Sequence, residues 1–138
     1  MAKVSAVVGS QIFLDSLIRM DSISKEIDGS TLFQLSWDDV GNSSVSISCG
    51  QDCVVIVALW EHDNRHDDLI DLLQLDGWML RKEQQMKWNR DGEYGNTRGV
   101  LSQIIQANNS ISFSRPENSL PISVFVFEGK IITHVFDI

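Results

Sequence analysis

The segment Cys53–Trp60 constrains the fold of this chain more than any other. Every residue from Val54 to Leu59 is apolar. A short apolar run without polar alternation is typical of a strand that is covered on both faces of its sheet. The run is far shorter than the roughly 20 residues that a membrane-spanning helix needs. The sequence therefore predicts a central strand here.

Alternation of apolar and polar residues predicts half-buried antiparallel strands around this centre. We expect them at residues 33–37, 45–49, 78–88, 111–113 and 122–127, the third with an exposed middle. The last is expected to form a C-terminal hairpin with residues 131–136 around Glu128-Gly129-Lys130. Gly50-Gln51-Asp52 has the length of a hairpin turn, so Cys49 and Cys53 are expected to face each other across it.

Helical spacing of apolar residues predicts short helices at residues 10–20 with Ser10 as the cap, behind Asn64 and at residues 100–109, with a loop at 89–99. The second is the best marked, because Asn64 can cap its start and Gly77 can end it. No linker or repeat divides the chain, so residues 1–138 are expected to form a single domain. The predicted fold is α+β: a mainly antiparallel sheet, two or three short helices packed against it, and a C-terminal hairpin.

Two cysteines are too few for a disulfide scaffold, and the first residues do not resemble a secretory signal. We therefore expect a cytoplasmic protein whose Cys49 and Cys53 are thiols. A disulfide between them, or a share in a metal site, stays open. Without a second pair of Cys or His residues nearby, the zinc interpretation is the weaker one.

The net charge of −8 makes nucleic acids and anionic membranes poor partners, because both repel an acidic surface. The acidity is also unevenly distributed. Residues 52–76 contain seven acidic residues and one arginine, whereas residues 77–100 contain five basic and three acidic residues. This asymmetry favours a directed face for a basic protein partner over a general contribution to solubility.

Two groups of residues are the candidates for that partner-binding surface. The first is acidic and follows the central strand, and the second combines aromatic and cationic side chains in the expected loop. They are Glu61, Asp63, Asp67, Asp68 and Asp71, and then Trp88, Arg90 and Tyr94.

His62 and His66 are the weak candidates for a metal site. Histidines four residues apart can share a metal on one helix face, with a nearby aspartate as a further ligand. Asn64 is the better helix cap, however, and it would leave His62 outside the helix. We expect no cofactor and no catalytic residue.

In its size, acidity and short α+β layout the chain resembles the immunity proteins of bacterial polymorphic and contact-dependent toxin systems. That resemblance covers the whole chain without a diagnostic motif. It implies a non-enzymatic inhibitor of a basic, nuclease-type toxin domain.

Two alternative functions stay open. One is a dimeric secretion chaperone for an effector, although such chaperones finish with a helix and this chain with a hairpin. The other is a small metal-dependent enzyme using His62, His66 and nearby aspartates. A homodimer stays open as well.

Overall fold

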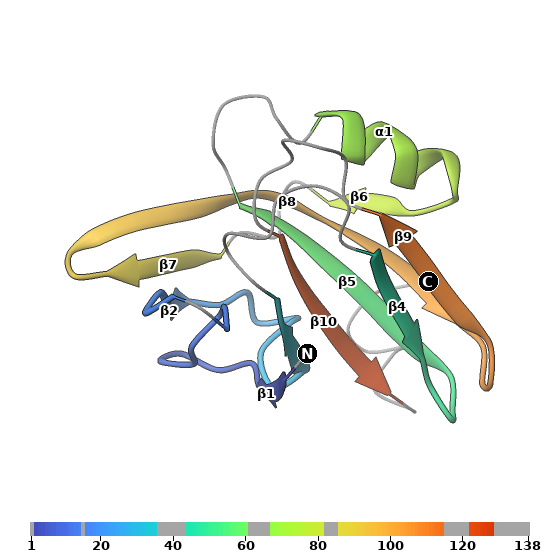
Figure 1. Cartoon of the computed structure of the whole chain (residues 1–138), viewed down its shortest axis with the longest axis horizontal. Coiled ribbons are helices and arrows are strands. Elements are labelled where there is room, and N and C mark those ends of the chain that lie inside the picture. The colour runs from blue at the N-terminus through green and yellow to red at the C-terminus, as the bar shows by residue number, and fades with distance from the viewer. Residues whose placement is uncertain are drawn as a thin grey trace.

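The computed structural model describes residues 2–14, 16–35, 44–60, 67–81, 86–114 and 122–128. Within these ranges the chain forms ten strands and one helix (Figure 1). In chain order they are β1 (Ala2–Ser5), β2 (Arg19–Ser22), β3 (Thr31–Gln34), β4 (Ser44–Ser48), β5 (Cys53–Trp60), α1 (Asp67–Leu75), β6 (Met79–Arg81), β7 (Lys87–Arg90), β8 (Glu93–Ile105), β9 (Ser110–Ser114) and β10 (Ile122–Glu128).

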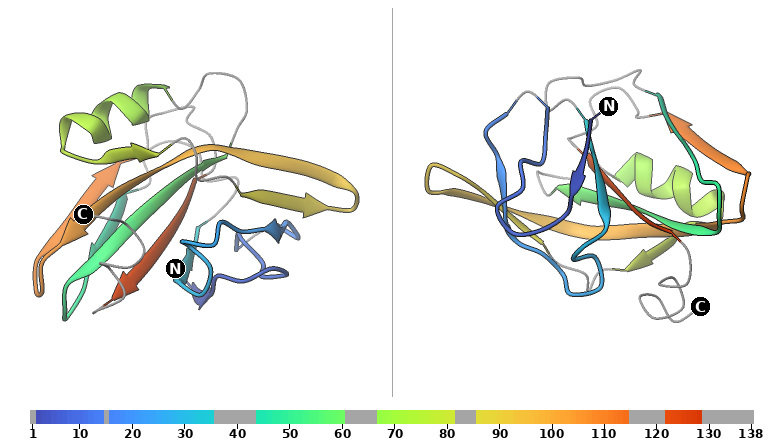
Figure 2. Two further views of the ribbon diagram at one scale, coloured as in Figure 1. Left: turned by 180° about the vertical axis from the view of Figure 1, so that it is seen from behind. Right: turned by 90° about the horizontal axis from the view of Figure 1, so that it is seen from below.

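The strands form one large sheet and one small one. The large sheet has the order β1-β3-β10-β5-β8-β7-β2, with β6 also paired to β8. The small sheet contains β4 and β9. Neighbouring strands in both sheets run antiparallel. The large sheet curls strongly, as the two further views show (Figure 2).

The prediction of a central strand at Cys53–Trp60 is confirmed. β5 lies between β10 and β8, and each of its eight residues is buried. Successive side chains of a strand point to opposite faces. Val54, Ile56, Ala58 and Trp60 accordingly join one buried cluster, whereas Cys53, Val55, Val57 and Leu59 join a second.

Different segments cover the two faces of the sheet. On the N-terminal face, defined by the cluster around Val54 and Ile56, the chain between β1 and β3 contributes Ile12, Phe13 and Ile18. On the helix face, defined by the cluster around Val55 and Val57, the covering residues come from α1 and from the small sheet. They are Leu69, Leu73 and Ile47, with Ile111 packed against them. Figure 1 shows α1 and the N-terminal segment on opposite sides of β5.

The prediction of an α+β fold with two or three helices is wrong, because the described residues contain a single short helix in a mostly antiparallel β structure. Residues 100–105 belong to β8. Val100 and Leu101 are both fully buried, one in each cluster, so this part of β8 lacks the alternation of a half-buried strand. Because the strand is covered on both faces, adjacent residues are both apolar, and the resulting spacing is the same as that of an amphipathic helix.

The helix expected behind Ser10 is also absent from the described residues. Ile12 and Phe13 are fully buried, whereas Leu14 and Leu17 are 48% and 71% exposed. The segment is irregular and crosses the sheet, where an isolated bridge pairs Gln11 with Arg19. Packing of single side chains on the N-terminal face thus replaces the expected amphipathic helix.

The loop expected at residues 89–99 is in fact a hairpin between β7 and β8. Asp91 and Gly92 form its turn, with φ values of +51° and +87°. Positive φ at both central residues is the geometry of a type I′ turn, which Asp-Gly favours because glycine and aspartate tolerate that region. The Asp-Gly dipeptide was the signal in the sequence that predicts this hairpin.

The turn expected at Gly50-Gln51-Asp52 does not join a hairpin. β4 pairs with β9, and β5 pairs with β8 and β10, so the two strands flanking this turn belong to different sheets. A disulfide joins Cys49 and Cys53 across it, in place of the two expected thiols.

The remaining strand predictions are met in part. β10 lies where expected, and β3 overlaps the strand expected at 33–37 at residues 33 and 34. Trp37 and the second strand of the expected C-terminal hairpin lie outside the described residues. The strand expected at 78–88 is divided into β6 and β7, both paired with β8.

No helix in the described ranges is both long and apolar enough to cross a lipid bilayer. The single domain and the cytoplasmic location stay predictions.

Candidate functional site

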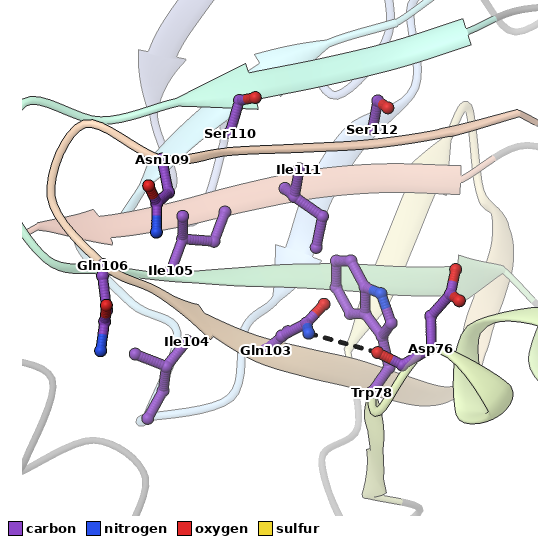
Figure 3. A pocket seen from close by; sticks show the side chains of 10 residues that line it. All are labelled: Asp76, Trp78, Gln103, Ile104, Ile105, Gln106, Asn109, Ser110, Ile111 and Ser112. Atoms are coloured by element: carbon purple, nitrogen blue, oxygen red, sulfur yellow. Dashed lines mark hydrogen bonds between the residues drawn. The ribbon is translucent and has the colours of Figure 1, made fainter.

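A hollow of about 530 Å³ opens on the helix face, between the end of β8 and β9. Figure 3 shows Trp78 and Asp76 at one end of it and Asn109 and Gln106 at the other. Ten residues line it: Asp76, Trp78, Gln103, Ile104, Ile105, Gln106, Asn109, Ser110, Ile111 and Ser112. The wall therefore combines apolar side chains with hydroxyl, amide and carboxylate groups.

The end of α1 places Asp76 and Trp78 in this wall. The backbone N–H of Trp78 donates to the carbonyl of Leu73 at 3.0 Å, and that of Gly77 donates to Gln74 at 3.1 Å. With Gly77 at a φ of +89°, these two bonds form the Schellman motif that ends many helices. The helix predicted to stop at Gly77 is thus confirmed. Trp78 turns back to pack in the same cluster as Leu73.

The turn between β8 and β9 forms the opposite end of the hollow. The backbone N–H of Ala107 donates to Oδ1 of Asp52 at 2.8 Å, and that of Asn108 donates to the carbonyl of Cys49 at 2.9 Å. Asn108 has a φ of +64°, a conformation that asparagine tolerates better than most residues. The disulfide-linked segment Cys49 to Cys53 therefore holds the turn that presents Gln106 and Asn109.

Gln103, on β8, is hydrogen-bonded to the end of the hollow formed by Asp76. Its Nε2 donates to the backbone carbonyl of Asp76 at 3.3 Å, drawn as a dashed line in Figure 3. Its Oε1 is buried and has no hydrogen-bond partner among the described residues. A buried amide oxygen without a partner is unfavourable, and a donor entering the hollow could satisfy it after a small side-chain movement.

The lining suits the binding of a neutral, polar molecule. Amide side chains donate and accept hydrogen bonds, and serine hydroxyls do the same. Among the described residues of the lining, Asp76 is the one ionisable residue, and none of them carries a basic side chain that could pair with an anionic ligand. Concave sites of this volume with a few polar groups over an apolar wall are typical of small-molecule binding.

The acidic candidates from the sequence are described only in part. Glu61, His62, Asp63 and His66 lie outside the described residues. Asp67 and Asp68 are the first two residues of α1. Asp71 is exposed on the same helix. No group of three metal-ligating side chains occurs in the described ranges, which leave out both candidate histidines.

The aromatic and cationic candidates lie on the β7–β8 hairpin, which projects from the opposite end of the large sheet from α1 (Figure 1). Arg90 is exposed, and so is Tyr94, whose exposed fraction is 58%. Trp88 is partly buried, because its indole covers Gly95 on β8 and packs against the buried cluster of the N-terminal face. The described members of the two predicted groups are thus not brought together, and Trp88 has a clear packing role.

None of the residues that line the hollow was among the sequence candidates. They come from the end of α1, from β8 and from β9, which only the fold brings side by side. The one local signal was Gly77 followed by Trp78, which predicts the helix end but not what that end faces.

No protein-family model matches this sequence, and no curated protein matches it. Solved structures do share its fold. A GH138 enzyme targeting the pectin rhamnogalacturonan II aligns over 94% of the chain with a TM-score of 0.64 and 18% identity. A β-glucuronidase from glycoside hydrolase family 2 aligns over 94% with a TM-score of 0.68 and 15% identity.

This chain spans only 16% and 14% of the lengths of those two enzymes. It is therefore similar in fold to one part of a much longer glycoside hydrolase. At these identities the similarity concerns the fold alone.

Proposed function

We propose that this chain is a non-catalytic carbohydrate-binding β-domain whose hollow holds a neutral saccharide. The observation that carries the proposal is the lining of the hollow, where two glutamines, one asparagine and two serines surround an apolar wall. Sugar hydroxyls both donate and accept hydrogen bonds, and these side chains offer both functions. The similarity in fold to parts of two glycoside hydrolases supports a carbohydrate as the ligand class.

The proposal is for binding rather than hydrolysis. Glycoside hydrolysis commonly uses two carboxyl groups on either side of the scissile bond. Among the described residues, the lining of the hollow supplies one, that of Asp76. A neutral sugar is favoured over a uronate, because Asp76 and the net charge of −8 would repel a ligand carboxylate.

Titration with neutral oligosaccharides, followed by NMR and calorimetry, tests this function. We expect shifts at Gln103, Gln106 and Asn109. The double variant Gln106→Ala/Asn109→Ala should weaken binding by about tenfold or more, because each hydrogen bond contributes about 0.5–1.5 kcal/mol. Gln74→Ala, an exposed glutamine on α1 outside the lining, serves as the matched control.

Two results would refute the proposal. One is no binding of any neutral oligosaccharide at millimolar concentration. The other is equal affinity of the double variant and the parent chain. Tighter binding of oligogalacturonides than of neutral sugars would overturn the choice of a neutral ligand. Inhibition of a basic toxin, the chaperone role and the metal-dependent enzyme stay predictions, because the described residues do not test them.

A further inference from the structure

The helix α1 is apolar on both of its sides. Leu69 and Leu73 are each 1% exposed and pack into the cluster on the helix face of the sheet. Leu72 and Leu75 are 52% and 84% exposed. Because residues three apart are neighbours on a helix surface, these two leucines form one apolar patch that faces solvent. A surface helix normally presents polar residues there, so the patch calls for a function.

The charges beside this patch have one sign. α1 contains three aspartates and no basic residue. Asp71 is exposed four residues before Leu75, and Asp76 is exposed four residues after Leu72, the spacing of neighbours on a helix surface. The two leucines are therefore bordered by carboxylates. We call Asp71, Leu72 and Leu75, together with Asp76 directly after the helix, the outer face of α1.

We propose that the outer face of α1 docks a protein partner through an apolar groove that is rimmed by lysine or arginine. The two leucines would fill the groove, in the way that amphipathic helices bind grooves through residues at i and i+3. The aspartates would pair with the basic rim and set the orientation of the partner. This inference does not depend on the proposed saccharide site.

Charge selects this partner over two other occupants. In a symmetric dimer, the same patch of a second copy would bring carboxylates against carboxylates, which is unfavourable. An anionic lipid surface would be repelled in the same way. A basic protein surface is complementary to both the patch and the net charge of −8.

The probe for the test is a helical peptide with leucines on one side and lysines on the other. A matched peptide carries glutamate in place of each lysine. With isotope-labelled leucine methyl groups in the whole chain, NMR titration at low salt reports where each peptide binds. We expect the lysine peptide to shift the methyl signals of Leu72 and Leu75, and the glutamate peptide to shift neither.

Variants separate the apolar and the charged contributions. Leu72→Gln/Leu75→Gln should weaken binding of the lysine peptide by about tenfold or more, because two exposed leucines lose their burial on docking. Asp71→Asn should weaken it less and reduce its dependence on salt. Leu17→Gln changes a leucine that is 71% exposed in the N-terminal segment and should leave the affinity unchanged. Thermal unfolding of each variant checks that the fold is kept.

Four outcomes would overturn the inference: no binding of the lysine peptide, shifts that spread over other surfaces, equal binding of the glutamate peptide, or equal loss in Leu17→Gln. If the methyl signals of Leu72 and Leu75 shift when the concentration of the chain alone is raised, the occupant is a second copy of the chain instead. Asp76 is left unchanged throughout, because it also lines the hollow. Saccharide binding should be intact in the leucine variants, so failure of this inference is distinct from failure of the proposed function.

Discussion

Two buried serines in this core differ in their hydrogen bonding. Ser123 on β10 is 1% exposed, and its Oγ accepts a hydrogen bond from Nε1 of Trp60 at 2.8 Å. Ser30 is 2% exposed, and its Oγ has no hydrogen-bond partner among the described residues. A buried polar group contributes to stability only when it is hydrogen-bonded. The same substitution should therefore have different effects at the two positions.

We expect Ser123→Ala to lower the free energy of unfolding by about 1–3 kcal/mol, because it removes the acceptor of a buried indole N–H. Ser30→Ala, the matched control, should be neutral or stabilising, because it removes a hydroxyl that is buried without a partner. Urea denaturation followed by tryptophan fluorescence measures both. Equal destabilisation by the two substitutions would show that loss of packing, rather than the hydrogen bond, determines the effect.

At the scale of elements, the end of α1 connects the helix to the hollow. The turn depends on Gly77, whose φ of +89° is accessible to glycine at no cost. The carbonyl of the preceding Asp76 accepts the hydrogen bond from Gln103. A change in this turn should therefore affect both the stability of the chain and the shape of the hollow.

Gly77→Ala should lower the free energy of unfolding by about 1–2 kcal/mol, the cost of a Cβ in the left-handed region. The nearest side-chain atom to the added Cβ is Nε2 of Gln103 at 3.8 Å, an ordinary contact, so steric overlap contributes little. Gly50→Ala is the control, because it has open space around it and no positive φ. Chemical denaturation of the two variants compares them directly. A loss in Gly50→Ala as large as that in Gly77→Ala would count against the backbone explanation.

Elements also show where local sequence patterns succeed. α1 and β5 were predicted because each carries a pattern that its own residues complete: a helix stop at Gly77, and an apolar run from Val54 to Leu59. β8 was predicted wrongly over residues 100–105, because the chain between β1 and β3 packs on one of its faces and α1 on the other, which buries Val100 and Leu101 on opposite faces. Burial on both faces depends on the segments that pack there. The sequence of residues 100–105 does not specify those segments.

At the scale of the whole molecule, the net charge of −8 acts on both stability and binding. Repulsion among like charges destabilises the compact state, and salt screens it. Raising the ionic strength from about 0.01 M to about 0.1 M shortens the screening length from about 30 Å to about 10 Å. We expect the Tm to rise by a few degrees over this range.

Differential scanning calorimetry at several sodium chloride concentrations measures the effect. Affinity for a neutral saccharide should change little over the same range, because the ligand carries no charge. A Tm that falls with added salt would show that attractive ion pairs outweigh repulsion among the acidic residues.

The sequence by itself determined the central strand, the helix that stops at Gly77 and the acidity of residues 52–76. Each is set by neighbouring residues: an unbroken apolar run, a helix stop and a count of charges. Tertiary structure alone decided that β4 pairs with β9 instead of β5, that residues 100–105 form a strand, and that Trp78, Gln103 and Asn109 line one hollow. Strand pairing and burial on two faces depend on contacts between residues far apart in the chain, and no local pattern specifies those partners.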